Sequence, residues 1–151
     1  MREIEFRGIS IETNKIIYGS LAVPNMGTNC VYIYNTDSVQ YTGELAQYEV
    51  YPESIGQHID YKDKTEKKIF EGDIIRLHTG VSFVDDQLMK VCFHQGSFGL
   101  RSLEHDGISV FTSFTPMCAI SRDLIDRNIF KEVEEVLEVV GNIHQNKELI
   151  K

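Results

Sequence analysis

The hydrophobic and polar positions along the chain alternate in short segments, which is typical of β-strands with one buried face. Near the start, Ile4 and Phe6 alternate with charged residues, and the apolar segment 16–18 follows a polar stretch. These two segments predict an opening β-hairpin with Thr13-Asn14 at its turn, because Asn tolerates the backbone conformations of tight turns.

Later segments repeat this pattern, with turn residues at intervals of about ten. They predict strands at 31–34, 48–50, 73–77, 90–93, 97–100, 109–112 and 138–140. Gly72 predicts a tight turn before 73–77, and Gly96 supplies the positive φ of a hairpin turn between 90–93 and 97–100. Short strands at this spacing predict a barrel or roll.

Three further segments depart from the strand pattern. Residues 60–68 carry seven charges in nine positions and predict a solvated hairpin loop. Residues 122–137 keep roughly helical apolar spacing, so part of this segment is predicted as helix, while the rest stays open between helix and strand. Gly141-Asn142 is predicted as a turn, because both residues tolerate a left-handed φ.

The composition is that of one soluble globular domain, or of one domain plus a small appendage. The 151 residues are 42% apolar and 25% charged, and 15 Lys+Arg against 23 Asp+Glu give a formal net charge of −8. Such a surface repels phosphate backbones and anionic lipid at long range, although a local basic patch still binds either. Nucleic acid is therefore disfavoured as a partner, and we expect no membrane association.

The cysteines Cys30, Cys92 and Cys118 are odd in number and form no C-x-x-C pair. They predict free thiols in a reducing cytosol rather than a disulfide framework or a zinc ribbon. The N-terminal residues lack the apolar run of a signal peptide. Gly, Pro and Asn interrupt the long uncharged stretch 16–36, which predicts strands and a loop rather than a membrane-spanning helix.

Four carboxylates lie close together in the sequence, at Asp60, Asp63, Glu71 and Asp73. Paired carboxylates can hold magnesium or act as acid and base, but these form no D-x-D-x-D-G loop, and neighbouring lysines neutralise them. We expect Asp73 instead to accept hydrogen bonds from turn amides near Gly72.

Cys92 and His94 are two residues apart and would share a strand face, which is compatible with a metal pair. No further ligand lies within reach in the sequence, so a core cysteine and a hairpin-end histidine are favoured. Ser97 and Ser113 have no G-x-S-x-G context, and no cysteine has an activating partner. We therefore expect no enzyme, no metal and no cofactor.

Several short motifs follow one another along the chain. They are Ile4-Glu5-Phe6-Arg7, Ile17-Tyr18-Gly19, Ile55-Gly56-Gln57 with Lys62-Asp63-Lys64, Ile69–Ile75, Phe93–Phe98, and Val139–His144 with Glu148-Leu149-Ile150. From residue 2 to 150, this ordered set resembles the YopX family, small proteins encoded by phages and prophages of bacteria.

The resemblance implies a mainly β fold with some α structure: a small bent β-barrel or roll of the Src-homology-three (SH3) type, with added strands and a short helix. It implies a single domain over 1–151, with an N-terminal β-hairpin subdomain at 1–50 packed on the barrel, in the cytoplasm of the bacterial host. It implies no established biochemical activity. The family-motif positions taken as candidate interaction sites are Gln57, Lys62, Asp63, Gly72, Asp73, Gly96, Gly141 and Asn142.

We expect a non-enzymatic phage or prophage accessory protein that binds a host or phage protein. Self-association is a further expectation, because hairpin-rich folds with many aromatic residues often pair or cover their edges. The tyrosines at 32, 34, 41, 48, 51 and 61 form either an aromatic ligand groove or, as we favour, cross-strand packing pairs.

Two hypotheses from other classes remain. A nucleic-acid-associated regulator would use a local basic patch and bind in a salt-dependent way; its residues would be Lys62, Lys64, Lys67, Lys68 and Arg76. A hydrolase or nuclease is the least favoured; its residues would be Asp63, Glu71, Asp73 or His94.

Overall fold

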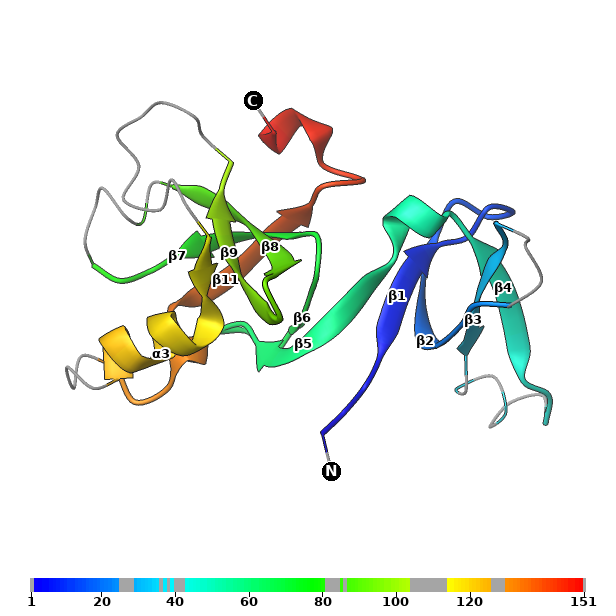
Figure 1. The fold of residues 1–151 in the computed structure, drawn as a ribbon, viewed down its shortest axis with the longest axis horizontal. Coiled ribbons are helices and arrows are strands. Elements are labelled where there is room, and N and C mark those ends of the chain that lie inside the picture. The colour runs from blue at the N-terminus through cyan, green and yellow to red at the C-terminus, as the bar shows by residue number, and fades with distance from the viewer. Residues whose placement is uncertain are drawn as a thin grey trace. The chain divides into compact units, whose positions relative to one another are not determined.

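The computed structural model describes residues 2–24, 29–35, 37, 39, 43–80, 85, 87–103, 114–125 and 130–150. The chain divides into two compact units, which we call unit 1 (Met1–Asp60) and unit 2 (Tyr61–Lys151) (Figure 1). Each unit is described by itself below. The expected hairpin subdomain at 1–50 and its packing on a barrel stay a prediction.

Unit 1 is built from one antiparallel sheet. Its strands are β1 (Phe6–Ile9), β2 (Ile16–Ala22), β3 (Val31–Asn35), β4 (Ala46–Val50) and the first part of β5 (Gly56–Lys62), and a short 3₁₀ helix spans Pro52–Ser54. The strand order is β4-β3-β2-β1-β5. The predicted opening hairpin is confirmed, since β1 pairs with β2 and Asn14 has a φ of 55° in the turn.

The sheet of unit 1 bends around a small core of Val31, Ile33 and Val50. An isolated bridge between Ser10, directly after β1, and Val50 at the end of β4 brings these two strands together. Gly8 allows this close approach, because a Cβ atom there would lie 3.0 Å from the Cβ of Val50. The side chains that face away from this core are consequently presented on the outer face of β2, β3 and β4.

Unit 2 contains a second antiparallel sheet with the order β10-β9-β8-β7-β11 (Figure 1). Its elements are β6 (Lys68–Phe70), β7 (Asp73–Leu77), β8 (Leu88–His94), β9 (Ser97–Ser102), β10 (Thr115–Pro116), the helix α3 (Met117–Ile125), β11 (Leu137–Asn142), and 3₁₀ helices at Val133–Val136 and Lys147–Leu149. The side chains buried in this unit include Ile75, Leu77, Met89, Val91, Leu100, Val136 and Leu137. β6 follows β5 in the strand order of the other sheet.

Two predicted turns of unit 2 are confirmed. Gly72 has a φ of 84° directly before β7, which begins at Asp73. In the β8–β9 hairpin, Gln95 and Gly96 have φ values of 48° and 83°. Two successive positive φ values match the right-handed twist of the flanking strands, so this two-residue turn fixes the register of the hairpin.

Several local predictions need correction. β5 continues to Lys62, so the charged hairpin loop is shorter than 60–68, and Asp63 within it is only 3% exposed. In the segment 122–137, the prediction that part is helix is confirmed, because α3 extends to Ile125, whereas β11 already begins at Leu137. The predicted strand 109–112 and Tyr41 lie outside the described residues.

Gly141 and Asn142 lie inside β11 and not in a turn, and neither has a positive φ. Both pair with β7, opposite Ile74 and Asp73, across an irregularity between Val139 and Gly141. The prediction was wrong because sequence reasoning took two turn-forming residues as a turn, whereas a β-bulge also accommodates them.

The predicted mainly β fold with a short helix is confirmed by two antiparallel sheets and α3. The strands of the described residues form no closed barrel. In the part of the chain that the structure describes, no helix combines the length and apolar character needed to cross a membrane.

Candidate functional site

Five of the eight motif positions meet at β11, the last strand of unit 2. Asp73 pairs with Asn142, and Gly141 lies opposite Ile74 in the same strand pair. The carbonyl oxygen of Gly72 accepts a hydrogen bond of 2.9 Å from the amide of Ile143, directly after β11. The fifth position, Asp63, reaches β11 from the turn that follows β5.

The carboxylate of Asp63 joins this turn to β11. Its Oδ1 accepts hydrogen bonds from the Thr65 amide (2.8 Å), the Thr65 hydroxyl (2.7 Å) and the Lys67 amide (3.1 Å). Its Oδ2 accepts a bond of 3.1 Å from the Val139 amide. The Lys64 amide adds a backbone bond of 2.9 Å to the carbonyl of Leu137.

These bonds determine the charge state of Asp63. Burial acts to raise the pKa of its carboxyl, but the hydrogen bonds from Thr65, Val139 and Lys67 together outweigh burial and lower the pKa below its ordinary value. Donated N–H and O–H bonds favour the ionised form. Asp63 therefore stabilises the fold as a carboxylate. Its hydrogen bonds account for its burial without a metal ion or a substrate.

Asp73 has a similar structural role, as expected from the sequence. It is 1% exposed, and its Oδ2 accepts a hydrogen bond of 2.9 Å from the amide of Phe70 across the turn at Gly72. The Gly72 amide donates in turn to the carbonyl of Val91, at 2.9 Å. The short carboxylate thus satisfies a buried turn amide.

Gly141 and Asn142 fix the chain after β11. The Oδ1 of Asn142 accepts bonds from the amides of His144 (3.0 Å) and Gln145 (2.9 Å), while its own amide donates to the Oδ1 of Asn146 at 3.1 Å. A Cβ atom at Gly141 would lie 2.6 Å from that same oxygen. Glycine is therefore required here by close approach rather than by φ.

The other three motif positions lie apart from β11. Gln57 belongs to unit 1, where it is half-buried and pairs with Phe6. Lys62 is exposed and forms an ion pair of 3.2 Å with Glu66. Gly96 is exposed at the hairpin tip, with nothing within 4 Å of a Cβ atom built on it. The motif positions as a set therefore do not form one site.

The predicted basic patch is partly neutralised by acidic neighbours. Besides the Lys62–Glu66 pair, Lys64 lies 3.5 Å from Glu138 and 3.1 Å from the Nε2 of His78, which is itself 2.5 Å from Glu138. The hydrogen bond to His78 is the main reason that the pKa of Glu138 is lowered. Burial acts in the opposite direction with a smaller effect, and the charge of Lys64 lowers the pKa further.

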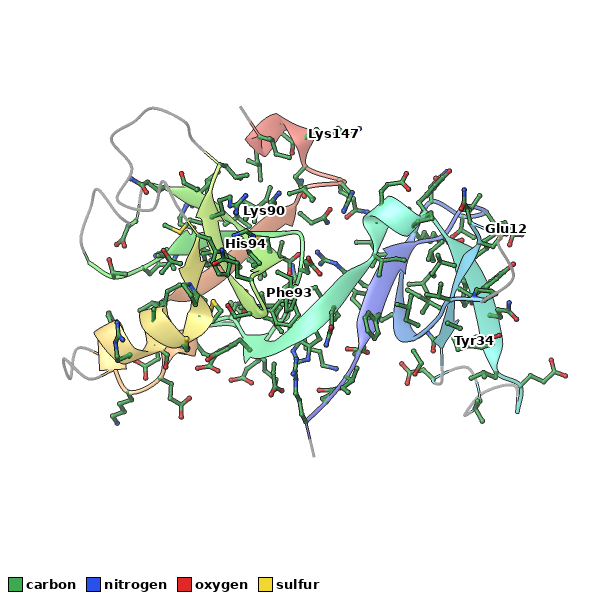
Figure 2. All side chains as sticks on the ribbon, in the orientation of Figure 1. Glu12, Tyr34, Lys90, Phe93, His94 and Lys147 are labelled. Atoms are coloured by element: carbon green, nitrogen blue, oxygen red, sulfur yellow. The ribbon has the colours of Figure 1, made fainter. Side chains whose placement is uncertain are left out.

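A different set of basic residues shares one face of the unit 2 sheet. Lys90 on β8 lies opposite Arg101 on β9 and opposite Ile74 on β7. Arg76 lies two residues after Ile74 and so points to the same side. We call Arg76, Lys90 and Arg101, with Cys92, His94 and Phe114, the cationic face. Figure 2 shows Lys90 and His94 in this part of unit 2.

Phe114 and His94 give the cationic face an aromatic edge. Their ring centroids are 5.3 Å apart, in an edge-on arrangement. A Cβ atom at Gly99, which pairs with Cys92, would lie 2.5 Å from the Phe114 ring. Phe114 therefore covers Gly99 beside the Lys90–Arg101 pair.

Cys92 and His94 share this face, as the sequence predicts, since both lie on β8 two residues apart. Among the described residues, no group of three or more His, Cys, Asp or Glu side chains could hold a metal ion. Burial raises the pKa of the Cys92 thiol, and the nearby charges of Arg101 and Lys90 only partly oppose this shift. The thiol is therefore a poor nucleophile near neutral pH.

Sequence reasoning missed Lys90 and Arg101 as a pair, although the signal was present. A two-residue turn at Gln95-Gly96 makes residues opposite when they are equally distant from it. The predicted strands, 90–93 and 97–100, instead left a three-residue loop and placed Lys90 opposite Leu100, so the predicted hairpin did not contain this pair.

The tyrosines divide between two sides of the unit 1 sheet. Tyr48 lies opposite Ile33, on the core side. Tyr32 and Tyr34 lie opposite Glu49 and Gln47, on the outer side. Tyr18, two residues before Ser20, shares this side, because Ser20 pairs with Tyr34. We call Tyr18, Tyr32 and Tyr34, with Ser20, Ala22, Gln47 and Glu49, the tyrosine face; Figure 2 labels Tyr34.

Comparison with known proteins assigns the family. The family model described as YopX protein matches residues 5–151, essentially the whole chain. The chain belongs to the YopX family. The resemblance drawn from the motifs is thereby confirmed.

A solved structure also resembles this YopX-family chain. It is the crystal structure of protein EF1440 from Enterococcus faecalis, with 17% sequence identity, a TM-score of 0.51 and 100% of both chains covered. At this identity the likeness shows the fold alone. No curated protein matches the chain. Neither the family description nor the name of the neighbour states an activity.

Replacing Asp63 by Asn tests its structural role. We expect Asp63→Asn to lower the free energy of unfolding by about 2 to 4 kcal/mol at pH 7, because buried amide donors lose a charged acceptor. The pKa of Asp63 is lower in the folded than in the unfolded protein. Its contribution to stability is therefore fully present above the unfolded pKa of about 3.9, and this contribution is lost as the pH falls through the folded pKa. Urea denaturation from pH 7 to pH 2.5 should show a shallower acid-side loss in the variant. An equal loss in both proteins would contradict this role.

A double-mutant cycle tests the contact between Gly141 and Asn146. We expect Gly141→Ala to cost about 1 to 2 kcal/mol, because the new methyl group displaces the Asn146 side chain from the Asn142 amide. In an Asn146→Ala background the same change should cost much less, since the clashing atoms are gone. Additive values in thermal unfolding would show that Gly141 is required for another reason.

Proposed function

We propose that this YopX-family protein is a non-enzymatic interaction module of a phage or prophage, acting in the cytoplasm of the bacterial host. The tyrosine face of unit 1 is proposed to bind a host or phage protein. The observation that carries this proposal is the arrangement of three tyrosines around small residues on the outer side of β2 and β3. The SH3-type barrel or roll and self-association remain part of the proposal.

The tyrosine face has the features of a protein interface. Tyr18 is 40% exposed, and Tyr32 and Tyr34 are half-buried. Tyrosine rings supply a large contact area with little loss of side-chain entropy, and they are enriched at the energetic centres of interfaces. The small Ser20 and Ala22 lie opposite Tyr34 and Tyr32, so that a partner side chain can approach the rings.

Cys30 and Glu49 raise the pKa of Tyr32 on this face. A hydrogen bond with Cys30 is the main reason that the pKa of Tyr32 is raised, and the charges of Cys30 and Glu49 add to this shift. The same Glu49 is the main cause of the raised pKa of Cys30, through a hydrogen bond. The raised pKa keeps the Tyr32 phenol neutral at physiological pH.

The charge of unit 1 indicates what kind of partner it binds. This unit contains 3 Lys+Arg and 8 Asp+Glu, whereas unit 2 contains 12 and 15. A protein surface with exposed Lys or Arg side chains complements it, both through long-range attraction and through cation–π contact with the tyrosines.

No catalytic role is part of the proposal. The two most buried candidate carboxylates, Asp63 and Asp73, accept hydrogen bonds from backbone amides. The His94 ring lies against Phe114.

The test compares variants in affinity capture from host lysate, with quantitative mass spectrometry. We expect at least one protein to be captured in stoichiometric amount by the wild type and to be reduced about tenfold or more by Tyr32→Ala/Tyr34→Ala, since loss of two hot-spot rings removes several kcal/mol. Tyr51→Ala is the matched control, because Tyr51 is also exposed (36%) but follows β4 outside this face. Equal loss in the control, or retention in the double variant, would contradict the proposal.

A further inference from the structure

Unit 2 contains an arrangement that is unfavourable for the folded protein alone. Lys90 and Arg101 lie directly opposite each other in neighbouring strands, and Arg76 is on the same face, two residues after Ile74. Like charges at directly opposed positions destabilise a sheet. An anionic ligand placed between them would convert this repulsion into attraction.

Two carboxylates lie near these three charges: Glu138 is opposite Arg76, and Glu71 is close enough to Cys92 to raise its pKa. Arg76, Lys90 and Arg101 take part in none of the ion pairs that the described residues form. The nearest strand neighbour with a carboxylate, Glu138, lies opposite Arg76 but is held by Lys64 and His78. Arg76 and Arg101 are exposed, and Lys90 is half-buried, so a ligand has access to the three cations.

The face is bounded on two sides. At the β11 side, the side chain of Asn146 lies over Gly141, whose partner is Ile74. At the hairpin side, Phe114 lies over Gly99, with the exposed His94 against its ring. The accessible region therefore runs from Arg76 across the Lys90–Arg101 pair to an aromatic ring.

We infer that this cationic face binds single-stranded nucleic acid, with backbone phosphates at Arg76, Lys90 and Arg101 and a base against Phe114. A row of cations beside an aromatic ring is how β-sheet surfaces hold single strands, because phosphates need positive charge and unpaired bases need a stacking partner. A duplex offers no free base face, and an acidic peptide gains nothing from the ring. This inference concerns a different unit and ligand from the proposed protein interface.

The overall charge determines the expected affinity. A net charge of −8 opposes the approach of a polyanion, but this repulsion is screened beyond about 8 Å at physiological salt. Binding should therefore be weak and strongly dependent on salt. With three phosphates neutralised, log K should fall against log salt with a slope of about −2, since each phosphate on a single strand contributes about −0.7.

The experiment measures fluorescence anisotropy of a labelled oligo-dT of about 20 nucleotides with the full chain, at salt concentrations from about 50 to 200 mM. A duplex of the same length and an oligo-glutamate peptide are tested alongside. We expect binding of the single strand, weaker binding of the duplex, and no binding of the peptide. Lys90→Ala/Arg101→Ala should reduce affinity about tenfold or more and lower the slope to about −0.7.

Controls separate this role from a structural one. Lys15→Ala/Lys131→Ala removes the same number of charges from exposed positions outside the face and should leave binding nearly unchanged. Arg101→Thr should weaken binding while keeping or raising the Tm, because it relieves a like-charge pair. Arg76→Ala tests the face from another strand if the double variant fails to fold.

Three results would overturn the inference. The first is no binding of the single strand at the lowest salt, and the second is an equal loss of affinity in the Lys15/Lys131 control. The third is a preference for the duplex or the oligo-glutamate peptide, which would assign the face to another class of partner. Since the tyrosine variants leave unit 2 unchanged, failure here is distinguishable from failure of the protein-interaction proposal.

Discussion

The carboxylate of Asp63 connects two parts of unit 2 that are far apart in the sequence. One oxygen holds the turn that follows β5, and the other holds the amide of Val139 in β11. Among the described strands, β11 lies at the edge of its sheet and pairs with β7. The buried charge is stable there because N–H and O–H donors surround it, and this requirement fixes the turn and the strand together.

The remaining motif residues around β11 depend on the same constraint. With β11 in place, Asn142 lies opposite Asp73, and the amide of Ile143 reaches the carbonyl of Gly72. The residues that most resemble the family pattern are thus used to build the unit. The tyrosine face and the cationic face contain none of the eight candidate positions, although Tyr18 and His94 each belong to one of the motifs.

The sequence predicted the features that depend on residues close together in the chain, namely the turns and most strands. The turns at Asn14, Gly72 and Gln95-Gly96 follow from backbone preferences of single residues, and alternation of polar and apolar residues located most strands. The Lys90–Arg101 pair was missed because the predicted loop was one residue longer than the observed turn at Gln95-Gly96. The structural role of Asp73 was also predictable, because its hydrogen-bond donor, Phe70, is three residues away.

Long-range contacts could not be predicted in this way. Asp63 and Val139 are 76 residues apart, and nothing in the charged segment 60–68 indicates that one of its carboxylates is buried. Gly141 was taken for a turn residue because the contact that favours glycine was not visible in the sequence. The side chain of Asn146, which follows β11 in the chain, packs closely against Gly141. The pairing of Lys64 with Glu138 depends on the same tertiary contact.

A pH titration by NMR tests most directly whether Asp63 holds β11 as a carboxylate. The experiment follows the side-chain carboxyl carbon of Asp63 and the backbone amide proton of Val139 in the native protein as the pH falls. We expect one common midpoint, below the ordinary aspartate value of about 3.9, because protonation weakens the acceptor that the Val139 amide uses. A midpoint at or above that value, or a Val139 amide that does not respond, would contradict it.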